Sequence, residues 1–313
     1  MDFSTALHDV KKTVDREFQH FFTTKRIEAK NIHPETIQLV DQIADLTSRG
    51  GKRTRAFLVW LGYQSVIARS ESSSDAAISK KYEIASPSEW TRNDMVLHAM
   101  MGIELFQSFA LIHDDIIDED AMRRGSPTVH EYFKSEVLSP KSNVKDAKHF
   151  GESMAILAGD LALAWADELM GKVKSLKLKV KSDEIYQKMK EEVIFGQSLD
   201  VLAAAGLPSA DRAAINRYKT AWYSVVRPLQ IGACIAGAEE KTMEAFVPYG
   251  LAVGEGYQLR DDFLDGAISQ GTFQTQSTTY ENQATQAAHA IRASVGVAAL
   301  LTDFARFALN RDK

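Results

Sequence analysis

Cysteine, proline and excess charge of either sign are all scarce in this chain of 313 residues. The only cysteine, Cys234, excludes a disulfide framework within the chain and is compatible with the cytosol. Its place in the apolar run "IGACIAGA" predicts a buried structural thiol. The net charge of −5 argues against a nucleic-acid partner, because general nucleic-acid binders usually carry a basic excess.

Long uninterrupted apolar runs are also absent. No run approaches the ~18 apolar residues that a membrane span needs, so stable membrane insertion is not expected. The N-terminal stretch "MDFSTALHDVKKTVDREF" mixes acidic and basic residues and lacks the apolar core of a signal peptide. These features predict a soluble, cytoplasmic protein.

The scarcity of proline, with seven residues in all, goes together with long apolar patterns of helical period. Residues 91–118 repeat apolar side chains at this spacing, and "SMAILAGDLALAWADELM" (153–170) is apolar nearly all round, as in the centre of a bundle. No stretch carries a convincing hairpin or βαβ signal. The sequence therefore predicts one all-α domain over residues 1–313, with about ten helices.

Polar stretches between the apolar segments predict the connections. Loops are expected at 67–89, 138–148 and 268–283. The alternating lysines of "KVKSLKLKVKSDE" (172–184) favour a solvated connection between helices, and a basic patch facing lipid is the alternative.

Two acidic clusters with the same DDxxD spacing each close an apolar segment, "LIHDDIIDEDAMRRG" and "YQLRDDFLDG". Residues i and i+4 share a helix face, so each cluster would present carboxylates side by side. Such oxygens suit hard cations, and Mg²⁺ usually takes one or two carboxylates plus substrate phosphates. Two clusters facing each other across a bundle would hold a diphosphate through metal ions. The aspartates are Asp114, Asp115 and Asp118 in the first cluster, and Asp261, Asp262 and Asp265 in the second.

Other interpretations of the acidic clusters remain open. One cluster alone would suit a solvated helix end as well as a metal site, whereas two copies favour the metal site. A di-iron carboxylate bundle would need two Glu-x-x-His elements, and the chain has one, from Glu17 to His20.

A diphosphate also needs cations from the protein. In "RGGKRTR" (49–55), Gly50 and Gly51 give the backbone conformational freedom just before the basic residues. Arginine offers bidentate phosphate contacts and lysine a point charge. Each basic residue alone could be an ordinary solvent-exposed side chain, but together with the aspartates they indicate a polyanion site. The cations are Lys52, Arg53 and Arg55 in this run, and Arg123 and Arg124 just past the first aspartates.

These motifs resemble the trans-type (head-to-tail) isoprenyl diphosphate synthases. The resemblance extends over nearly the whole chain to residue 266, and the final helix-like segment also fits. It implies the family's all-α bundle around a central cavity, and a homodimer. The matching stretches are "GGKRTR", "ELFQSFALIHDDIIDEDAMRRGSPTVH", "ESMAILAGDLAL", "FGQSLD", "YKTAWYSVVRPLQIGACIAGA" and "GYQLRDDFLDG".

The resemblance assigns roles to individual residues, with Asp114, Asp115, Asp118, Lys219, Asp261 and Asp262 as the catalytic set. Mg²⁺ would be held by Asp114, Asp118 and Asp261, supported by Asp115, Asp262 and Asp265. The diphosphate of isopentenyl diphosphate would contact Lys52, Arg55, Gln107 and Arg124. The allylic prenyl diphosphate would contact Arg123, Lys219, Thr220 and Gln258.

The residues before Asp114 bear on product length. In the family, bulk five positions before the first aspartate limits the hydrocarbon chain, and that position holds Phe109, with Ala110 next to it and Phe106 one turn earlier. This favours a C15–C20 product, although plain core packing explains Phe109 equally well.

One departure from the family concerns the segment after the second cluster. Family members carry lysines there that close over the allylic diphosphate, but the sole lysine after Asp265 is Lys313. The expected activity is therefore that of a prenyltransferase, with reduced rate. The alternatives are a silent subunit that modulates an active synthase, a class I terpene cyclase, and a bundle whose charges are merely solvated.

Overall fold

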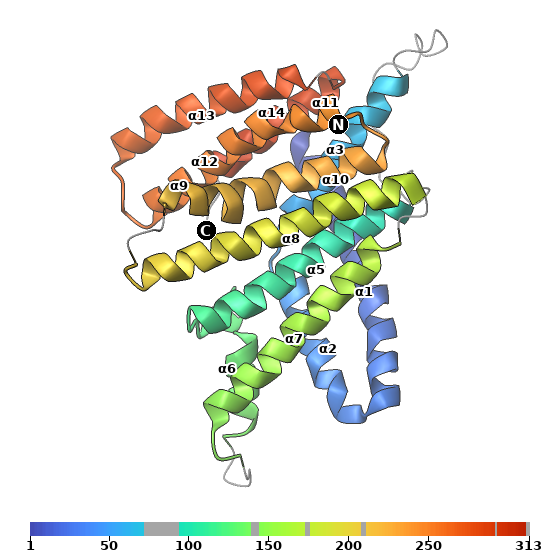
Figure 1. Ribbon diagram of the computed structural model, residues 1–313, viewed down its shortest axis with the longest axis vertical. Coiled ribbons are helices and arrows are strands. Elements are labelled where there is room, and N and C mark those ends of the chain that lie inside the picture. The colour runs from blue at the N-terminus through green and yellow to red at the C-terminus, as the bar shows by residue number, and fades with distance from the viewer. Residues whose placement is uncertain (72–93, 139–143, 173–175, 208–210, 292, 311–313) are drawn as a thin grey trace. The chain divides into compact units, whose positions relative to one another are not determined.

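The computed structural model describes residues 1–71, 94–138, 144–172, 176–207, 211–291 and 293–310 (Figure 1). Helices make up nearly all of this part, which confirms the all-α prediction. The long helices are α1 (Phe3–Ile32), α2 (Ile37–Ser48), α3 (Thr54–Glu71), α5 (Asp94–Ile117), α7 (Ala147–Met170), α8 (Leu176–Ala204), α12 (Phe246–Leu264), α13 (Gln270–Ala290) and α14 (Val295–Asn310). The shorter elements are η1 (Pro34–Thr36), α6 (Val129–Glu136), α9 (Arg212–Ile215), η3 (Asn216–Val226), α10 (Arg227–Ile235), α11 (Glu240–Glu244) and the strands β1 (Met122–Arg123) and β2 (Ser126–Pro127).

The chain divides into two compact units, each described here by itself. The first unit comprises Val10–Ala56 and Met100–Lys172 and contains the first aspartate cluster. The second unit comprises Met1–Asp9, Phe57–Ala99 and Val173–Lys313 and contains the second cluster. The expectation that the clusters face each other therefore stays a prediction.

Helices appear where the apolar pattern was strongest. Residues 91–118 contain α5 and residues 153–170 lie within α7, as predicted. Among the described residues, α5 alone is long and apolar enough to cross a membrane. Because its apolar part is mostly buried inside the fold, α5 has the character of a core helix.

The loop predicted at 268–283 is wrong, because α13 occupies most of it. Ser269 caps the helix by accepting a hydrogen bond from the Thr272 N–H at 3.2 Å. Phe273, Ala284 and Ala288 are buried along one face. Burial of this face outweighs the modest helix propensity of the many threonines.

The connection predicted at 172–184 is also wrong from residue 176 onward, where α8 begins. Ser182, Tyr186 and Met189 are buried at helical spacing, a period that the alternating lysines before them conceal. At 138–148 the described residues before 147 are outside helices, as predicted. The loop predicted at 67–89 lies outside the described residues beyond 71, and residues 67–71 belong to α3.

A small hairpin that the sequence did not predict follows the first aspartates. Strands β1 and β2 pair antiparallel, with Arg123 opposite Ser126. The two turn residues, Arg124 and Gly125, both have positive φ, at 52° and 76°, as in a type I′ turn. Two-residue strands cannot show alternation, and arginine is an unusual turn residue, so no sequence signal marks this hairpin.

Close backbone contact joins α3 and α10 within the second unit. A Cβ atom on Gly232 would lie 1.8 Å from the carbonyl oxygen of Val59. A Cβ atom on Gly62 would lie 2.0 Å from the carbonyl oxygen of Leu229. Reciprocal glycines thus allow the two helices to cross at a distance that no other residue permits.

The variant Gly232→Ala is expected to lower the free energy of unfolding by about 3 kcal/mol, because the helices must separate to admit the methyl group. Urea unfolding followed by circular dichroism measures this. Gly271→Ala is the control, since the nearest atom to its Cβ would be 4.0 Å away and alanine favours a helix. Equal stability of the two variants would contradict the close packing.

Candidate functional site

The first aspartate cluster forms the C-terminal end of α5. The Asp118 N–H donates to the Asp114 carbonyl oxygen at 2.8 Å, and the Asp120 N–H donates to the Asp115 carbonyl oxygen at 2.9 Å. Glu119 has φ of +54° and donates to the Ile116 carbonyl oxygen at 3.3 Å. This is a Schellman ending, with a glutamate in the position usually held by glycine.

The second cluster ends α12 in the same way. The Asp265 N–H donates to the Asp261 carbonyl oxygen at 2.9 Å, and the Ala267 N–H donates to the Asp262 carbonyl oxygen at 2.8 Å. Gly266, with φ of +73°, donates to the Phe263 carbonyl oxygen at 3.1 Å. The two DDxxD motifs therefore share spacing, helix-end position and terminal hydrogen-bond pattern.

A helix C-terminus is an unfavourable place for carboxylates, because the helix dipole and the last carbonyl groups are negative there. Each cluster thus needs positive charge nearby. In the first unit Arg123 supplies part of it, since its guanidinium pairs with Asp115, lies 3.2 Å from Asp120 and approaches Asp114 at 3.9 Å.

Asp115 is the buried member of the first cluster, with 0% of its side chain exposed. Burial raises the pKa of the Asp115 carboxyl to about 6, against the opposing effect of Arg123. Its Oδ2 atom is buried without a hydrogen-bond partner. Asp114 is partly exposed and Asp118 is exposed, so their carboxylates are accessible to a ligand.

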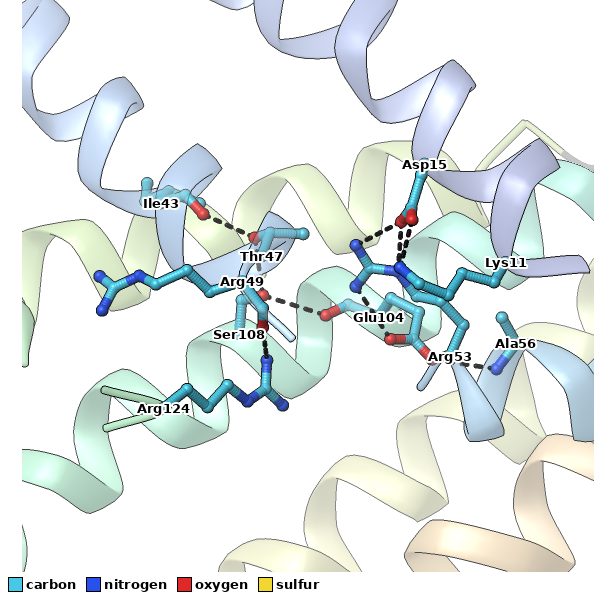
Figure 2. Close-up of polar contacts among 10 residues, drawn as sticks. All are labelled: Lys11, Asp15, Ile43, Thr47, Arg49, Arg53, Ala56, Glu104, Ser108 and Arg124. Carbon is cyan, nitrogen blue, oxygen red and sulfur yellow. Dashed lines mark hydrogen bonds and ion pairs between the residues drawn. The ribbon is translucent and has the colours of Figure 1, made fainter. Parts of the chain in front are cut away.

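The cations that the sequence assigns to a polyanion site in the first unit lie on the loop between α2 and α3, in the first turn of α3 and on the hairpin. Lys52 is exposed and Arg55 is partly exposed. The Arg124 guanidinium donates to the Arg49 carbonyl oxygen at 2.6 Å, as Figure 2 shows. In return, the Arg49 guanidinium donates to the Arg123 carbonyl oxygen at 3.4 Å. These two hydrogen bonds connect the loop to the hairpin.

Arg53 differs from the cations beside it. Its guanidinium pairs with Asp15 at 2.7 Å and with Glu104 at 3.3 Å (Figure 2). The sequence groups Arg53 with Lys52 and Arg55 as a cation for a polyanion, whereas in the structure it is buried against carboxylates. Neither Asp15 nor Glu104 stands out in the sequence, because neither belongs to a repeated acidic motif.

Arg124 lies in a crowded basic environment. Burial lowers the pKa of its guanidinium, and Arg53, Arg123 and Arg55 act in the same direction. Glu104 is the group that acts against them. Glu104, which pairs with Arg53, therefore also stabilises the charge of Arg124.

The residues expected to limit product length lie on α5, in the same unit. Phe106 is fully buried and Phe109 is 9% exposed, with their ring centroids 5.2 Å apart. Phe109 also contacts His113 edge to face at 4.8 Å. Ala110 and Gln107 are partly exposed. Core packing and a wall below the aspartates both remain consistent with this arrangement of Phe109.

The second unit places Lys219 and Thr220 on η3, an eleven-residue π-helix, a form often found at functional sites. The Lys219 ammonium lies 2.6 Å from a carboxylate oxygen of Asp200 on α8. A Cβ atom on Gly196 would lie 2.9 Å from the backbone nitrogen of Lys219, so glycine lets α8 approach η3 closely at this point. The sequence did not predict the π-helix or the partner of Lys219.

Beside the second cluster, Gln258 donates from Nε2 to Asp262 at 2.7 Å. The Arg260 guanidinium lies over the rings of Phe263 and Phe273, 5.5 Å and 5.4 Å from their centroids. These two rings stack at 4.6 Å, which packs the first turn of α13 against the end of α12. A docked helix therefore follows the second cluster where the family carries a lysine-bearing loop.

The donor atoms suit Mg²⁺ better in the presence of a substrate than alone. Among the described residues, no group of three or more His, Cys, Asp or Glu side chains is arranged to hold a metal ion. Mg²⁺ is commonly bound by one or two carboxylates plus substrate phosphates. The accessible Asp114 and Asp118, with the unpartnered Oδ2 of Asp115 beside them, fit an ion shared with a diphosphate.

Asp115→Asn is expected to stabilise the metal-free protein by about 2–3 kcal/mol at pH 8. The folded-state pKa of about 6 lies above the ordinary aspartate value of 3.8, so the folded state holds this proton more tightly. Stability therefore falls as pH rises from about 4 to 6, and the variant lacks this loss. Arg123 keeps Asp114 and Asp120 as partners.

Urea unfolding at pH 4 and pH 8 measures this effect, and the two proteins should converge in stability at pH 4. A variant less stable than the parent at pH 8 would mean that the Arg123 ion pair outweighs the cost of burying the charge.

Comparison with known proteins extends these observations. The polyprenyl synthetase family model matches residues 37–287. A short chain isoprenyl diphosphate synthase of Methanocaldococcus jannaschii is 32% identical over 216 residues, covering 69% of this chain and 54% of that protein. A geranylgeranyl diphosphate synthase of Methanosarcina mazei is 34% identical over 174 residues, covering 54% of this chain and 48% of that protein. The chain thus spans about half the length of the curated relatives it matches.

A solved structure shows the same fold. The geranylgeranyl pyrophosphate synthase of Corynebacterium glutamicum, complexed with isoprenyl diphosphate and magnesium, has a TM-score of 0.78 and 24% identity, with 100% of both chains covered. This likeness confirms the predicted isoprenoid-synthase class of all-α fold. Since the family model matches well over half of its residues, the chain belongs to the polyprenyl synthetase family.

Proposed function

We propose that the protein is a Mg²⁺-dependent trans-prenyltransferase that joins isopentenyl diphosphate to an allylic prenyl diphosphate. The observation that carries this proposal is the pair of DDxxD motifs with matching helix-end geometry. Two further observations support it. The chain belongs to the polyprenyl synthetase family, and the loop between α2 and α3 of the first unit is rich in basic residues. The relatives named as isoprenyl diphosphate synthases are consistent with the same chemistry.

The resemblance to the family divides the binding residues between the two substrates. In the first unit, Lys52, Arg55, Gln107 and Arg124 would hold the diphosphate of isopentenyl diphosphate. Arg123 of that unit, with Lys219, Thr220 and Gln258 of the second, would hold the allylic diphosphate. Asp114, Asp118 and Asp261 would hold Mg²⁺ ions, with Asp115, Asp262 and Asp265 in support. When bound, these ions would neutralise charge on the departing diphosphate.

The proposed reaction begins with ionisation of the allylic diphosphate. The carbon–oxygen bond of the allylic diphosphate breaks, and the bond's electron pair leaves with the diphosphate. The isopentenyl double bond then attacks the allylic carbocation, and a proton lost from the adduct passes to the departed diphosphate. Basic side chains stabilise the leaving group, and apolar residues such as Phe109 exclude water from the cation.

The helix after the second cluster bears on the rate. Among the described residues, α13 contains no lysine or arginine to contact the departing diphosphate. Loss of such donors commonly costs about 10²–10³-fold in rate each, so we expect reduced turnover. By resemblance to the family, we further propose a C15–C20 product and a cytoplasmic homodimer.

Asp114→Asn and Asp261→Asn are each expected to lower product formation by at least about 10²–10³-fold, because each removes a carboxylate from the proposed metal site. The assay is the incorporation of radiolabelled isopentenyl diphosphate into prenyl product with Mg²⁺ present. The control is Glu119→Gln, which removes an exposed acid that pairs with Lys148 at 2.9 Å. Absence of any product from the parent protein under all metal conditions would refute the proposed activity.

Phe109→Ala is expected to lengthen the product, because removing the ring opens space below the aspartates if the hydrocarbon chain grows there. Chromatography of the dephosphorylated products compares chain lengths. Phe133→Ala, which removes a buried ring of α6, is the control for general loss of packing. Identical product lengths in parent and Phe109→Ala would assign Phe109 to the core alone.

A further inference from the structure

The loop between α2 and α3 is fastened at both of its ends. At the end of α2, the Thr47 and Ser108 hydroxyls hydrogen-bond at 2.8 Å, which joins α2 to α5. At the start of α3, the Ala56 N–H donates to Glu104 Oε1 at 3.1 Å. Glu104 therefore caps α3 from another helix, and its second oxygen meets Arg53 at 3.3 Å (Figure 2).

Arg53 fastens the middle of the same loop. Its side chain is 3% exposed, its Nε donates to Asp15 at 2.8 Å, and its guanidinium lies over the Phe18 ring at 5.2 Å. Asp15 and Phe18 belong to α1, and Glu104 belongs to α5. One side chain thus joins the loop to two helices.

The backbone of the loop is left-handed at two positions. Gly50 has φ of +60° and Arg53 has φ of +54°, a conformation that is uncommon for a residue with a side chain. A Cβ atom on Gly51 would lie 3.3 Å from Arg53 Nη1 and 3.6 Å from Arg124 Nη1. Both guanidinium groups therefore lie against Gly51, although they repel each other.

We propose that Arg53 is a positioning residue that shapes this loop for a diphosphate without touching it. The inference rests on the proposed function, in which Lys52, Arg55 and Arg124 bind isopentenyl diphosphate. The guanidinium of Arg53 faces Asp15 and Glu104, and Lys52 beside it is exposed. By holding the strained turn in place, Arg53 keeps the binding cations arranged before the ligand arrives.

Calorimetric titration with isopentenyl diphosphate tests this role. Arg53→Gln is expected to raise the Kd by about 10–100-fold, because displaced cations lose their alignment with the diphosphate. Arg53→Lys should recover part of the affinity, since lysine keeps the charge but cannot bridge two carboxylates with a planar fork. Asp15→Asn, a milder change that leaves Arg53 and Glu104 paired, should raise the Kd less.

Lys25→Gln is the matched control. Lys25 is 9% exposed and pairs with Glu168 at 2.7 Å within the same unit, without contact to the loop. Its loss should lower the melting temperature as Arg53→Gln does, while the Kd stays at the parent value. An unchanged Kd in folded Arg53→Gln would make Arg53 a stabilising residue only and overturn the proposal.

Hydrogen exchange of the ligand-free proteins separates this inference from the proposed function. Arg53→Gln should speed exchange of the amides of residues 49–56, and Lys25→Gln should leave them unchanged. A parent protein that binds no isopentenyl diphosphate would refute the proposed function. Exchange in the loop would then decide the positioning role by itself, and an unchanged rate in Arg53→Gln would overturn it.

Discussion

Carboxylates at the negative ends of helices are the constraint on which the rest of this structure depends. Both α5 and α12 end in a DDxxD motif, where the helix dipole and the last carbonyl groups oppose additional negative charge. Packing several aspartates there is unfavourable unless cations are near. Arg123 supplies part of that charge at the first motif, and a divalent ion shared with a diphosphate would supply more. At each of these helix ends, binding of the metal ion and diphosphate would therefore relieve the repulsion between the aspartates and the negative end of the helix.

In the first unit, the loop between α2 and α3 (residues 49–53) concentrates positive rather than negative charge. Arg53 and Arg124 lie against the same glycine, where like charges repel. Glu104 offsets this repulsion and also caps α3, so one carboxylate both neutralises the cluster and fixes the helix that follows the loop. Glu104 is buried and Asp15 is half-buried against Arg53, whereas Lys52 is exposed. This division separates residues that shape the proposed site from residues that would contact a substrate.

The sequence predicted what depends on local pattern. Residues 91–118 show a long helical period, and the DDxxD motifs carry their chemistry in residue type and spacing. The helix α13 was missed because its stability comes from burying Phe273 and two alanines, which polar composition conceals. The contrast between Arg53 and Lys52 was missed for a related reason. Neighbouring cations look alike in sequence, and the ion pairs of Arg53 with Asp15 and Glu104 join residues far apart in the chain.

The central claim is that aspartates and arginines form a site for a diphosphate bound together with Mg²⁺. Calorimetric titration of the protein with inorganic pyrophosphate, with and without Mg²⁺, tests it most directly. The account predicts clear binding when Mg²⁺ is present and much weaker binding when the metal is removed. Pyrophosphate binding of equal strength without Mg²⁺, or no binding with it, would contradict the account.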